Sequence, residues 1–273
     1  MRVAEWIQLV FVALLALASW LLPLGTARKL RATLLALVAI AAIMVARFSA
    51  RWISPLGSSV LRDWLPAALL LVPYWQIGQF FTAPDSPMET RLAAFDRRFF
   101  RTLGIQPARV SIGAGFATYL QLAYVLVYPM IPFGLAALYI TGLRRNVDYY
   151  WLVVLPATYL CFAITPFVRA LPPRLLPGYE TFHLPATWIG ALNRGILDRA
   201  SIQAITFPSG HVASAMAAAL VLLRLEPAVG AIFLWIALSI AAATIVGGYH
   251  YAADVLLATA IALLVFAGTL CIR

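Results

Sequence analysis

Long apolar segments constrain this chain more than any other feature of its sequence. A helix needs roughly 20 apolar residues to cross the hydrocarbon core of a bilayer, and open strands cannot satisfy their backbone groups in lipid. The composition is 63% hydrophobic and 11% charged, with a mean hydropathy of +0.91, which excludes a soluble domain of this size. We therefore predict an all-α, polytopic membrane bundle with eight spans, at residues 3–22, 30–48, 65–81, 117–140, 149–167, 209–224, 228–246 and 252–272.

The apolar segments divide the chain into two parts. We predict an N-terminal transmembrane hairpin over residues 1–60 and a second membrane domain, with six helices, over residues 61–273. The first segment also has features of a cleavable signal peptide, because Arg2 precedes its apolar run and the small-residue triplet 16–18 follows. Glu5 and the second span that follows at once favour a retained helix instead.

An amphipathic stretch separates the third and fourth apolar segments. Apolar residues recur there at helical spacing, opposite several arginines: Leu92, Phe95, Phe99 and Leu103 against Arg91, Arg98 and Arg101. We predict an interfacial helix at 87–104 that lies in the plane of the membrane surface.

Positive charge is spread through the loops rather than gathered on one helix face. The formal net charge is +10, and Lys29 is the single lysine among 20 Lys and Arg residues. This distribution suits anionic lipid headgroups or a phosphate substrate better than nucleic acid. Ordinary anchoring at the interface accounts for most of these residues. We expect the membrane and an anionic lipid phosphate or phospholipid as partners, and no nucleic acid.

A proline-rich loop precedes the sixth apolar segment. Its three prolines, between residues 172 and 177, prevent a regular helix, so the loop holds Arg169 and Arg174 near the membrane surface. The next two segments cross the membrane and return. The loop, the start of segment 209–224 and the residues after 247 are therefore expected on one face.

Two polar motifs flank that pair of spans. The first is Pro208-Ser209-Gly210-His211, and the second is His250 with Asp254 four residues later. On a helix, His250 and Asp254 share one face, so the carboxylate can accept a hydrogen bond from the imidazole. Ionisable residues in membrane segments are costly, so two histidines expected on one face indicate a functional site.

This set of side chains suits phosphoryl transfer. Arg174 and Arg169 would hold an anion, helped by backbone amides where Ser209 and Gly210 open a helix. Ser209 fits equally well as a plain N-cap. One histidine, oriented by Asp254, can attack phosphorus, and the other can protonate the leaving oxygen. The sequence shows no Asp/Glu cluster or Cys/His spacing typical of a metal site, so we expect neither metal nor cofactor.

The two motifs resemble the second and third motifs of the type 2 phosphatidic acid phosphatase superfamily of lipid phosphatases and phosphotransferases. The resemblance covers the six spans from 65 to 272 and implies that family's six-helix core. It also implies a phosphohistidine intermediate formed without metal. Transferred by position, His250 would be the nucleophile, Asp254 its orienting partner and His211 the general acid. Ser209, Gly210 and Arg174 would be phosphate ligands.

The sequence departs from the family pattern at two cations. No lysine precedes the run Arg-Ala-Leu-Pro-Pro-Arg at 169–174, and Ala243 and Thr244 occupy the places of the usual Ser-Arg. The missing arginine and the Pro-Pro-Arg exit from the third core span are similar to the branch that includes inositol phosphorylceramide synthase and sphingomyelin synthase. The acceptor of the phosphoryl group is therefore left open between water and the hydroxyl of a second lipid or polyol.

Three functional hypotheses follow. The leading one is dephosphorylation of a lipid phosphate, and the second is transfer of a phosphorylated headgroup between lipids. The third, from a different class, is a membrane transporter, which broken helices and inverted repeats would favour. We see neither feature in the sequence.

The side of the membrane that holds the site is a separate question. Positive charge in the loops favours a cytoplasmic site, whereas the family resemblance implies an extracytoplasmic or lumenal one, which we adopt. We expect His183 to be a surface residue. Tyr119, Tyr124 and Tyr128 are expected to serve in packing.

Overall fold

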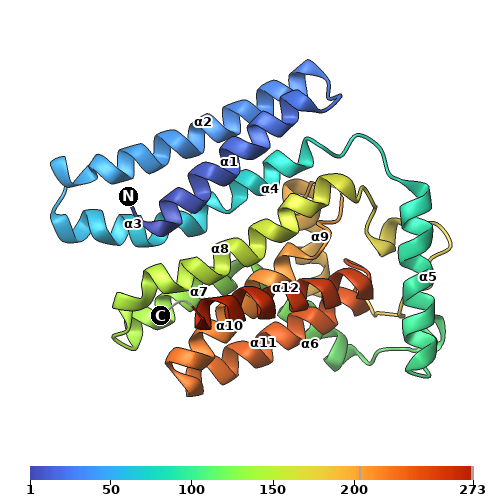
Figure 1. Cartoon of the computed structure of the whole chain (residues 1–273). Helices are drawn as coiled ribbons and strands as arrows, with labels where there is room; N and C mark the ends of the chain where they lie inside the picture. Colours follow the sequence, from blue (N-terminus) through green and yellow to red (C-terminus); the bar gives the residue numbers. More distant parts are fainter. Residues whose placement is uncertain (203, 272–273) are drawn as a thin grey trace.

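The structure, a computed structural model, describes residues 1–202 and 204–271, and its helices form one bundle crossed at one end by a single helix (Figure 1). The predicted all-α class is confirmed. The last residue of the predicted span 252–272 and the last two of the predicted domain 61–273 lie outside the described residues. The helices are α1 (Val3–Leu21), α2 (Thr26–Phe48), α3 (Pro55–Leu69), α4 (Leu71–Gly78), α5 (Ser86–Thr102), α6 (Ala114–Val125), α7 (Val127–Ile140), α8 (Val147–Ile164), α9 (Trp188–Ala200), α10 (Gly210–Leu225), α11 (Pro227–Val246) and α12 (Ala252–Leu270).

Five of the eight predicted spans are helices long enough to cross a membrane. Among the described residues, five stretches are long and apolar enough to cross a bilayer: Val3–Leu21, Thr26–Arg51, Arg144–Phe167, Pro227–Val246 and Ala252–Leu270. The predicted span 65–81 falls on α3 and α4, which are separated at Leu70 and do not reach that length. The predicted span 209–224 corresponds to α10, whose 16 residues extend for about 24 Å.

The predicted span 117–140 is a bent pair rather than a straight helix. α6 and α7 meet at an angle of 63° around Leu126. Pro129 explains the break, because it cannot donate the backbone hydrogen bond to Val125 that a continuous helix would need here, whereas α7 continues through Pro132. No broken helix was predicted from the sequence, and the bend between α6 and α7 corrects that prediction. The bend faces the rings of Tyr124 and Tyr128 toward His211, at centroid distances of 6.2 and 6.1 Å.

The short helix α10 forms the centre of the bundle and packs against α7, α8, α11 and α12. It is rich in alanine, and the buried alanines allow the neighbouring backbones to approach closely. At its C-terminal end, Gly230 of α11 lies so near the backbone of Leu223 that a Cβ would clash with it. The fully buried alanines of α10 are Ala213, Ala215, Ala217, Ala218 and Ala219.

Helix α5 runs across the ends of the other helices (Figure 1). The prediction of a helix at 87–104 agrees with its bounds, and the Asp85 side chain caps it by accepting from the Met88 N–H at 3.2 Å. Leu92 packs inward, whereas Phe95 and Leu103 are 43% and 55% exposed. The predicted apolar stripe is therefore divided between protein and surroundings. Its location in the membrane interface stays a prediction.

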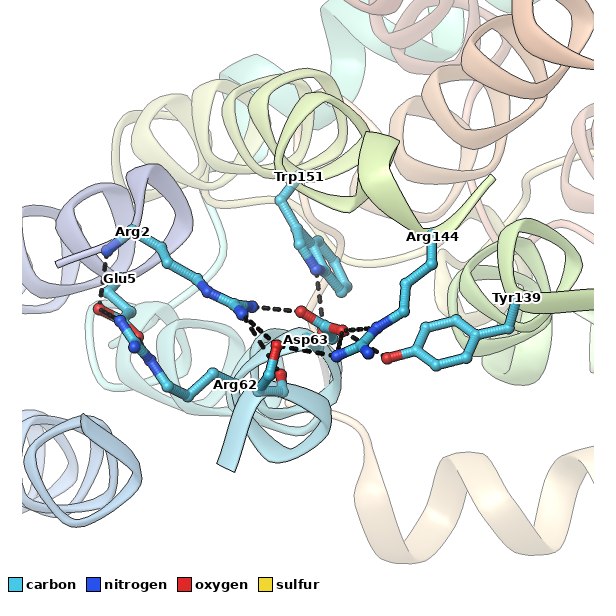
Figure 2. A network of polar contacts seen from close by, with 8 residues as sticks. Arg2, Glu5, Arg62, Asp63, Tyr139, Arg144 and Trp151 are labelled. Carbon is cyan, nitrogen blue, oxygen red and sulfur yellow. Dashed lines mark hydrogen bonds and ion pairs between the residues drawn. The ribbon is translucent and has the colours of Figure 1, made fainter. Parts of the chain in front are cut away.

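The N-terminal hairpin is fastened to the core by a polar network around Asp63 of α3 (Figure 2). The Asp63 carboxylate is 3% exposed and accepts hydrogen bonds from the Arg2 guanidinium, the Tyr139 hydroxyl and, at 2.8 Å, Arg144 Nε. Its backbone carbonyl accepts from Trp151 Nε1 at 2.9 Å. These contacts join α1, α3, α7 and α8 at the end of α8 where that helix begins.

Two further contacts hold the hairpin in place. Arg62 pairs with Glu5 at 2.6 Å beside the Asp63 network. At the opposite end of the hairpin, Arg28 donates to the carbonyls of Gln79 and Phe81 at 2.9 and 2.6 Å. The division into domains 1–60 and 61–273 stays a prediction, although the hairpin is bound to the core at both of its ends.

We expect Asp63→Ala to lower the free energy of unfolding by about 2 kcal/mol, because it removes the shared acceptor of two guanidinium groups and one hydroxyl. Chemical denaturation of the detergent-solubilised protein measures the loss. Asp148→Asn is the matched control, since Asp148 is an exposed acid near the start of α8 and should change stability by no more than about 0.5 kcal/mol. Equal losses in the two variants would contradict the role given to Asp63.

Candidate active site

The two motif histidines lie side by side at one end of the bundle. His211 is in the first turn of α10, and its ring centroid lies 6.2 Å from that of His250. That separation lets both rings touch one phosphoryl group. The sequence prediction that the two polar motifs share a face agrees with this geometry. His250 lies two residues before α12, so the expected helix that carries both His250 and Asp254 does not form.

His250 is oriented by Asp254, as the spacing of four residues predicts. His250 Nδ1 lies 3.0 Å from Asp254 Oδ2, with exposed fractions of 5% and 0% for the two side chains. The same carboxylate oxygen accepts the Tyr251 backbone N–H at 3.3 Å. Because Nδ1 faces the carboxylate, Nε2 is the ring nitrogen left to contact a substrate.

A tight turn between α11 and α12 places His250. The backbone N–H groups of Tyr249 and His250 both donate to the carbonyl of Thr244, at 3.0 and 3.3 Å. Thr244 stands where an arginine occurs in the family motif, and its hydroxyl donates to the Ile240 carbonyl at 2.5 Å. Thr244 is fully buried and serves the turn through its backbone.

Gly248 joins this turn to the proline loop. It has a φ of +64°, a conformation that favours glycine, and its carbonyl accepts the Arg174 N–H at 2.9 Å. A Cβ on Gly248 would lie 3.2 Å from the Arg174 nitrogen. The loop that carries Arg174 is thus placed by direct backbone contact with the turn that carries His250.

Tyr249 holds the Arg174 side chain over the site, and the sequence analysis missed its role. The Arg174 Cζ atom lies 4.9 Å from the centre of the Tyr249 ring, which stacks on Tyr124 at 3.9 Å. Asn193 Nδ2 donates to the Tyr249 hydroxyl at 2.7 Å. Burial raises the pKa of the Tyr249 phenol, so the ring stays neutral beside the guanidinium. The one sequence feature that could have indicated this role of Tyr249 is its position between Gly248 and His250.

Ser209 and Gly210 lie next to the site, and both have a structural role at the start of α10. Ser209 Oγ accepts the Val212 N–H at 3.4 Å as the N-cap of α10, and its own N–H donates to the Asp254 carbonyl at 3.3 Å. The Gly210 N–H donates to Thr206 Oγ1 at 3.0 Å. A Cβ on Gly210 would lie 2.5 Å from the Phe162 ring, so this position needs glycine for packing.

A cavity of about 30 Å³ opens between these elements, roughly the room of a single water molecule. Three of the four buried side-chain atoms that lack a hydrogen-bond partner in the described part of the chain belong to residues of this region: His211 Nδ1, Asp254 Oδ1 and Asn193 Oδ1. Native proteins leave few buried polar atoms unpaired, so their concentration here indicates a functional site. The polar residues that line the cavity include Arg174, Thr206, His211, Tyr249 and His250.

Two basic residues considered from the sequence lie away from the cavity. Arg169 donates to Thr82 Oγ1 at 3.1 Å, and its carbonyl accepts the Asp85 N–H at 2.7 Å, so its side chain is directed toward the segment before α5. His183 is exposed, with Nε2 at 2.7 Å from the Ala108 carbonyl. Among the described residues no group of three or more His, Cys, Asp or Glu side chains could hold a metal ion.

The sequence model of the PAP2 superfamily matches residues 91–268 of this chain. Because the match covers more than half of the chain and includes both histidine motifs, the chain belongs to the PAP2 superfamily. The resemblance to type 2 phosphatidic acid phosphatases is thereby confirmed at the level of the superfamily. Comparison with curated proteins and with solved structures found no match.

We expect Gly248→Ala to destabilise the protein more than Gly142→Ala. Both glycines have positive φ, +64° and +73°, so each substitution carries a backbone strain of about 1–2 kcal/mol. A Cβ meets nothing within 4 Å at Gly142, whereas at Gly248 it crowds the Arg174 backbone. Thermal unfolding of both variants in detergent measures the difference. Equal midpoints would show that the Gly248–Arg174 contact does not constrain the loop.

Proposed function

We propose that this protein is a membrane enzyme that dephosphorylates a lipid phosphate through a phosphohistidine intermediate, without a metal ion. Membership of the PAP2 superfamily supports phosphoryl transfer of the lipid phosphatase type. The observation that carries the finer proposal is the pair of histidines 6.2 Å apart, one of them bonded to a buried carboxylate.

In the first step, His250 Nε2 attacks phosphorus while the bond from phosphorus to the lipid oxygen breaks. His211 donates a proton to the departing oxygen, so the lipid leaves as an alcohol. Asp254 holds the His250 ring in the required tautomer and stabilises the positive charge that develops on it. In the second step His211 takes a proton from water, the water oxygen bonds to phosphorus, and the N–P bond breaks to release inorganic phosphate.

Arg174 is the proposed phosphate ligand, because its guanidinium borders the cavity that both histidines line. Ser209 and Gly210 would contribute through the start of α10, where the helix dipole favours an anion. The Gly210 N–H is bonded to Thr206 Oγ1, so an incoming phosphate would have to share or replace that bond. Arg169 stays a predicted ligand and would have to leave Thr82 to act.

The substrate is proposed to reach the site from within the membrane. The head of the 16-residue helix α10 carries His211, and a helix of about 24 Å is shorter than the hydrocarbon core of a typical bilayer, about 30 Å thick. The histidines would then lie below the headgroup plane, within reach of a lipid that approaches sideways. We place the site on the extracytoplasmic or lumenal face.

Thr244 favours a second candidate, a phosphotransferase similar to inositol phosphorylceramide synthase. With Thr244 in place of the family arginine, the site has one cation fewer to hold a doubly charged phosphomonoester. A phosphodiester carries a single negative charge and needs less compensation. Release of inorganic phosphate from lipid phosphates, compared with release of diacylglycerol from phospholipids, distinguishes the two reactions.

We expect His250→Ala to reduce phosphate release from a lipid phosphate by more than about 10³-fold, because the nucleophile is lost. His211→Ala should lose about 10²–10⁴-fold, the usual contribution of a general acid. The assay uses purified protein in detergent with a panel of lipid phosphates and phospholipids. A labelled phosphoryl group should be recovered on His250.

His183→Ala is the matched control for these variants. It removes the third histidine of the chain, which is exposed and lies outside the cavity, and it should keep the wild-type rate. Wild-type turnover by His250→Ala would exclude the proposed mechanism.

A further inference from the structure

Asp96 of α5 is a buried carboxylate that the proposed reaction does not use. It is 1% exposed, and its two oxygens have different partners. Oδ1 accepts the backbone N–H of Ala252 at 2.9 Å, and Oδ2 accepts the hydroxyl of Tyr179. One side chain of α5 therefore connects the first residue of α12 with the proline loop.

Helix α12 uses this contact in addition to its own acid, because Asp254 caps the Tyr251 N–H but does not reach the Ala252 N–H. The first N–H groups of a helix lack partners within it, and an acid near the N-terminus also complements the helix dipole. Asp254 is bonded to His250 and Tyr251. Asp96 supplies the acceptor for Ala252 from outside the helix.

The loop that carries Arg174 is held by the same face of α5 on both sides of that arginine. Before it, the Leu171 N–H donates to Glu89 Oε1 at 2.8 Å, and the Tyr251 hydroxyl donates to the Leu171 carbonyl at 3.1 Å. After it, Tyr179 bonds Asp96. Asp96 therefore bonds both to the loop that carries Arg174 and to the first residue of α12.

We propose that Asp96 is a positioning residue that holds the Arg174 loop and the start of α12, with the adjoining His250, at the spacing required for phosphoryl transfer. The inference rests on the proposed function. Asp96 touches neither the cavity of about 30 Å³ nor the reacting groups, so it acts through Tyr179 and Ala252.

The charge state of Asp96 gives this role a pH signature. Burial raises the pKa of Asp96 from 3.8 to about 6. The charge of Asp254 also raises this pKa, whereas the hydrogen bonds from Tyr179 and Ala252 lower it. Asp96 lines a cavity of about 900 Å³. The other titratable groups that line this cavity are Glu89, Arg97, Arg101, Arg109, Tyr179 and Glu180. On α12 and its N-cap, the titratable groups near Asp96 are Asp254 and Tyr251.

The folded protein consequently binds a proton at Asp96 more tightly than the unfolded chain does. The resulting stability is complete below about pH 4 and is lost as the pH rises to about 6. Asp96→Asn does not titrate, and its amide can still accept from Ala252 and donate to Tyr179. We expect the difference in melting temperature between wild type and Asp96→Asn to shift across this pH window and to be constant above pH 7. If the difference in melting temperature between wild type and Asp96→Asn stayed constant between pH 4 and pH 6, Asp96 would not titrate in this window and the inferred charge change would be wrong.

The activity test compares Asp96→Ala with Asp85→Ala, two substitutions at capping acids on one helix. Asp85 caps α5 itself and has no bond to α12. We expect Asp96→Ala to lower kcat for phosphate release by tenfold or more, with a smaller change in KM, because small misplacements of catalytic groups are costly. Asp85→Ala should keep the wild-type kcat, and Asp96→Asn should recover most of it.

A readout independent of activity separates this inference from the proposed function. Amide hydrogen exchange at residues 251–255 should be faster in Asp96→Ala than in wild type and unchanged in Asp85→Ala. If His250→Ala were as active as wild type, the proposed function would fail whatever the exchange showed. If wild type is active and Asp96→Ala keeps both its kcat and its exchange protection, the positioning role is wrong.

Discussion

The hydrogen bond from His250 to Asp254 is the interaction on which the candidate site depends. Asp254 is fully buried in the first turn of α12, and a carboxylate in such a place requires polar partners. Its bonds to His250 and Tyr251 define both the start of the helix and the orientation of the imidazole. Where that helix begins also determines three neighbouring contacts. These are the turn from Thr244, the contact of Gly248 with Arg174 and the cap that Asp96 supplies from α5.

Close packing of α10 brings the second histidine to the same place. A helix lined with alanine lets four neighbours approach it, and Gly210 lets its first turn meet the Phe162 ring. The cost of burying polar groups is concentrated at one end, where His211 Nδ1 and Asp254 Oδ1 lack partners within the described residues. Of these two atoms, only His211 Nδ1 can donate a hydrogen bond to a substrate phosphate, because Asp254 Oδ1 is itself an acceptor.

The sequence was sufficient for the features that depend on local spacing. The four-residue interval between His250 and Asp254 predicted their contact, and the crossing and return of two spans predicted that the proline loop would lie on the same face as both histidines. The bend between α6 and α7 was missed although Pro129 was visible, because hydropathy over a long window does not register a break. Asp96 gave no signal, since its partners lie 83 and 156 residues further along the chain. Proximity in sequence to Arg174 suggested a shared role for Arg169, which stays a prediction; in the structure its side chain is directed toward Thr82.

The pairing of charges in the first 63 residues has a consequence for biosynthesis. Asp63 and Glu5 are both buried, and an unpaired carboxylate in a membrane segment is strongly disfavoured. Their counter-charges, Arg2 and Arg62, belong to the same part of the chain. The N-terminal helices can therefore neutralise one another as they leave the ribosome, before α8 is made. When the later helices form, Arg144 and Trp151 bond to Asp63, whose charge is by then already paired with Arg2.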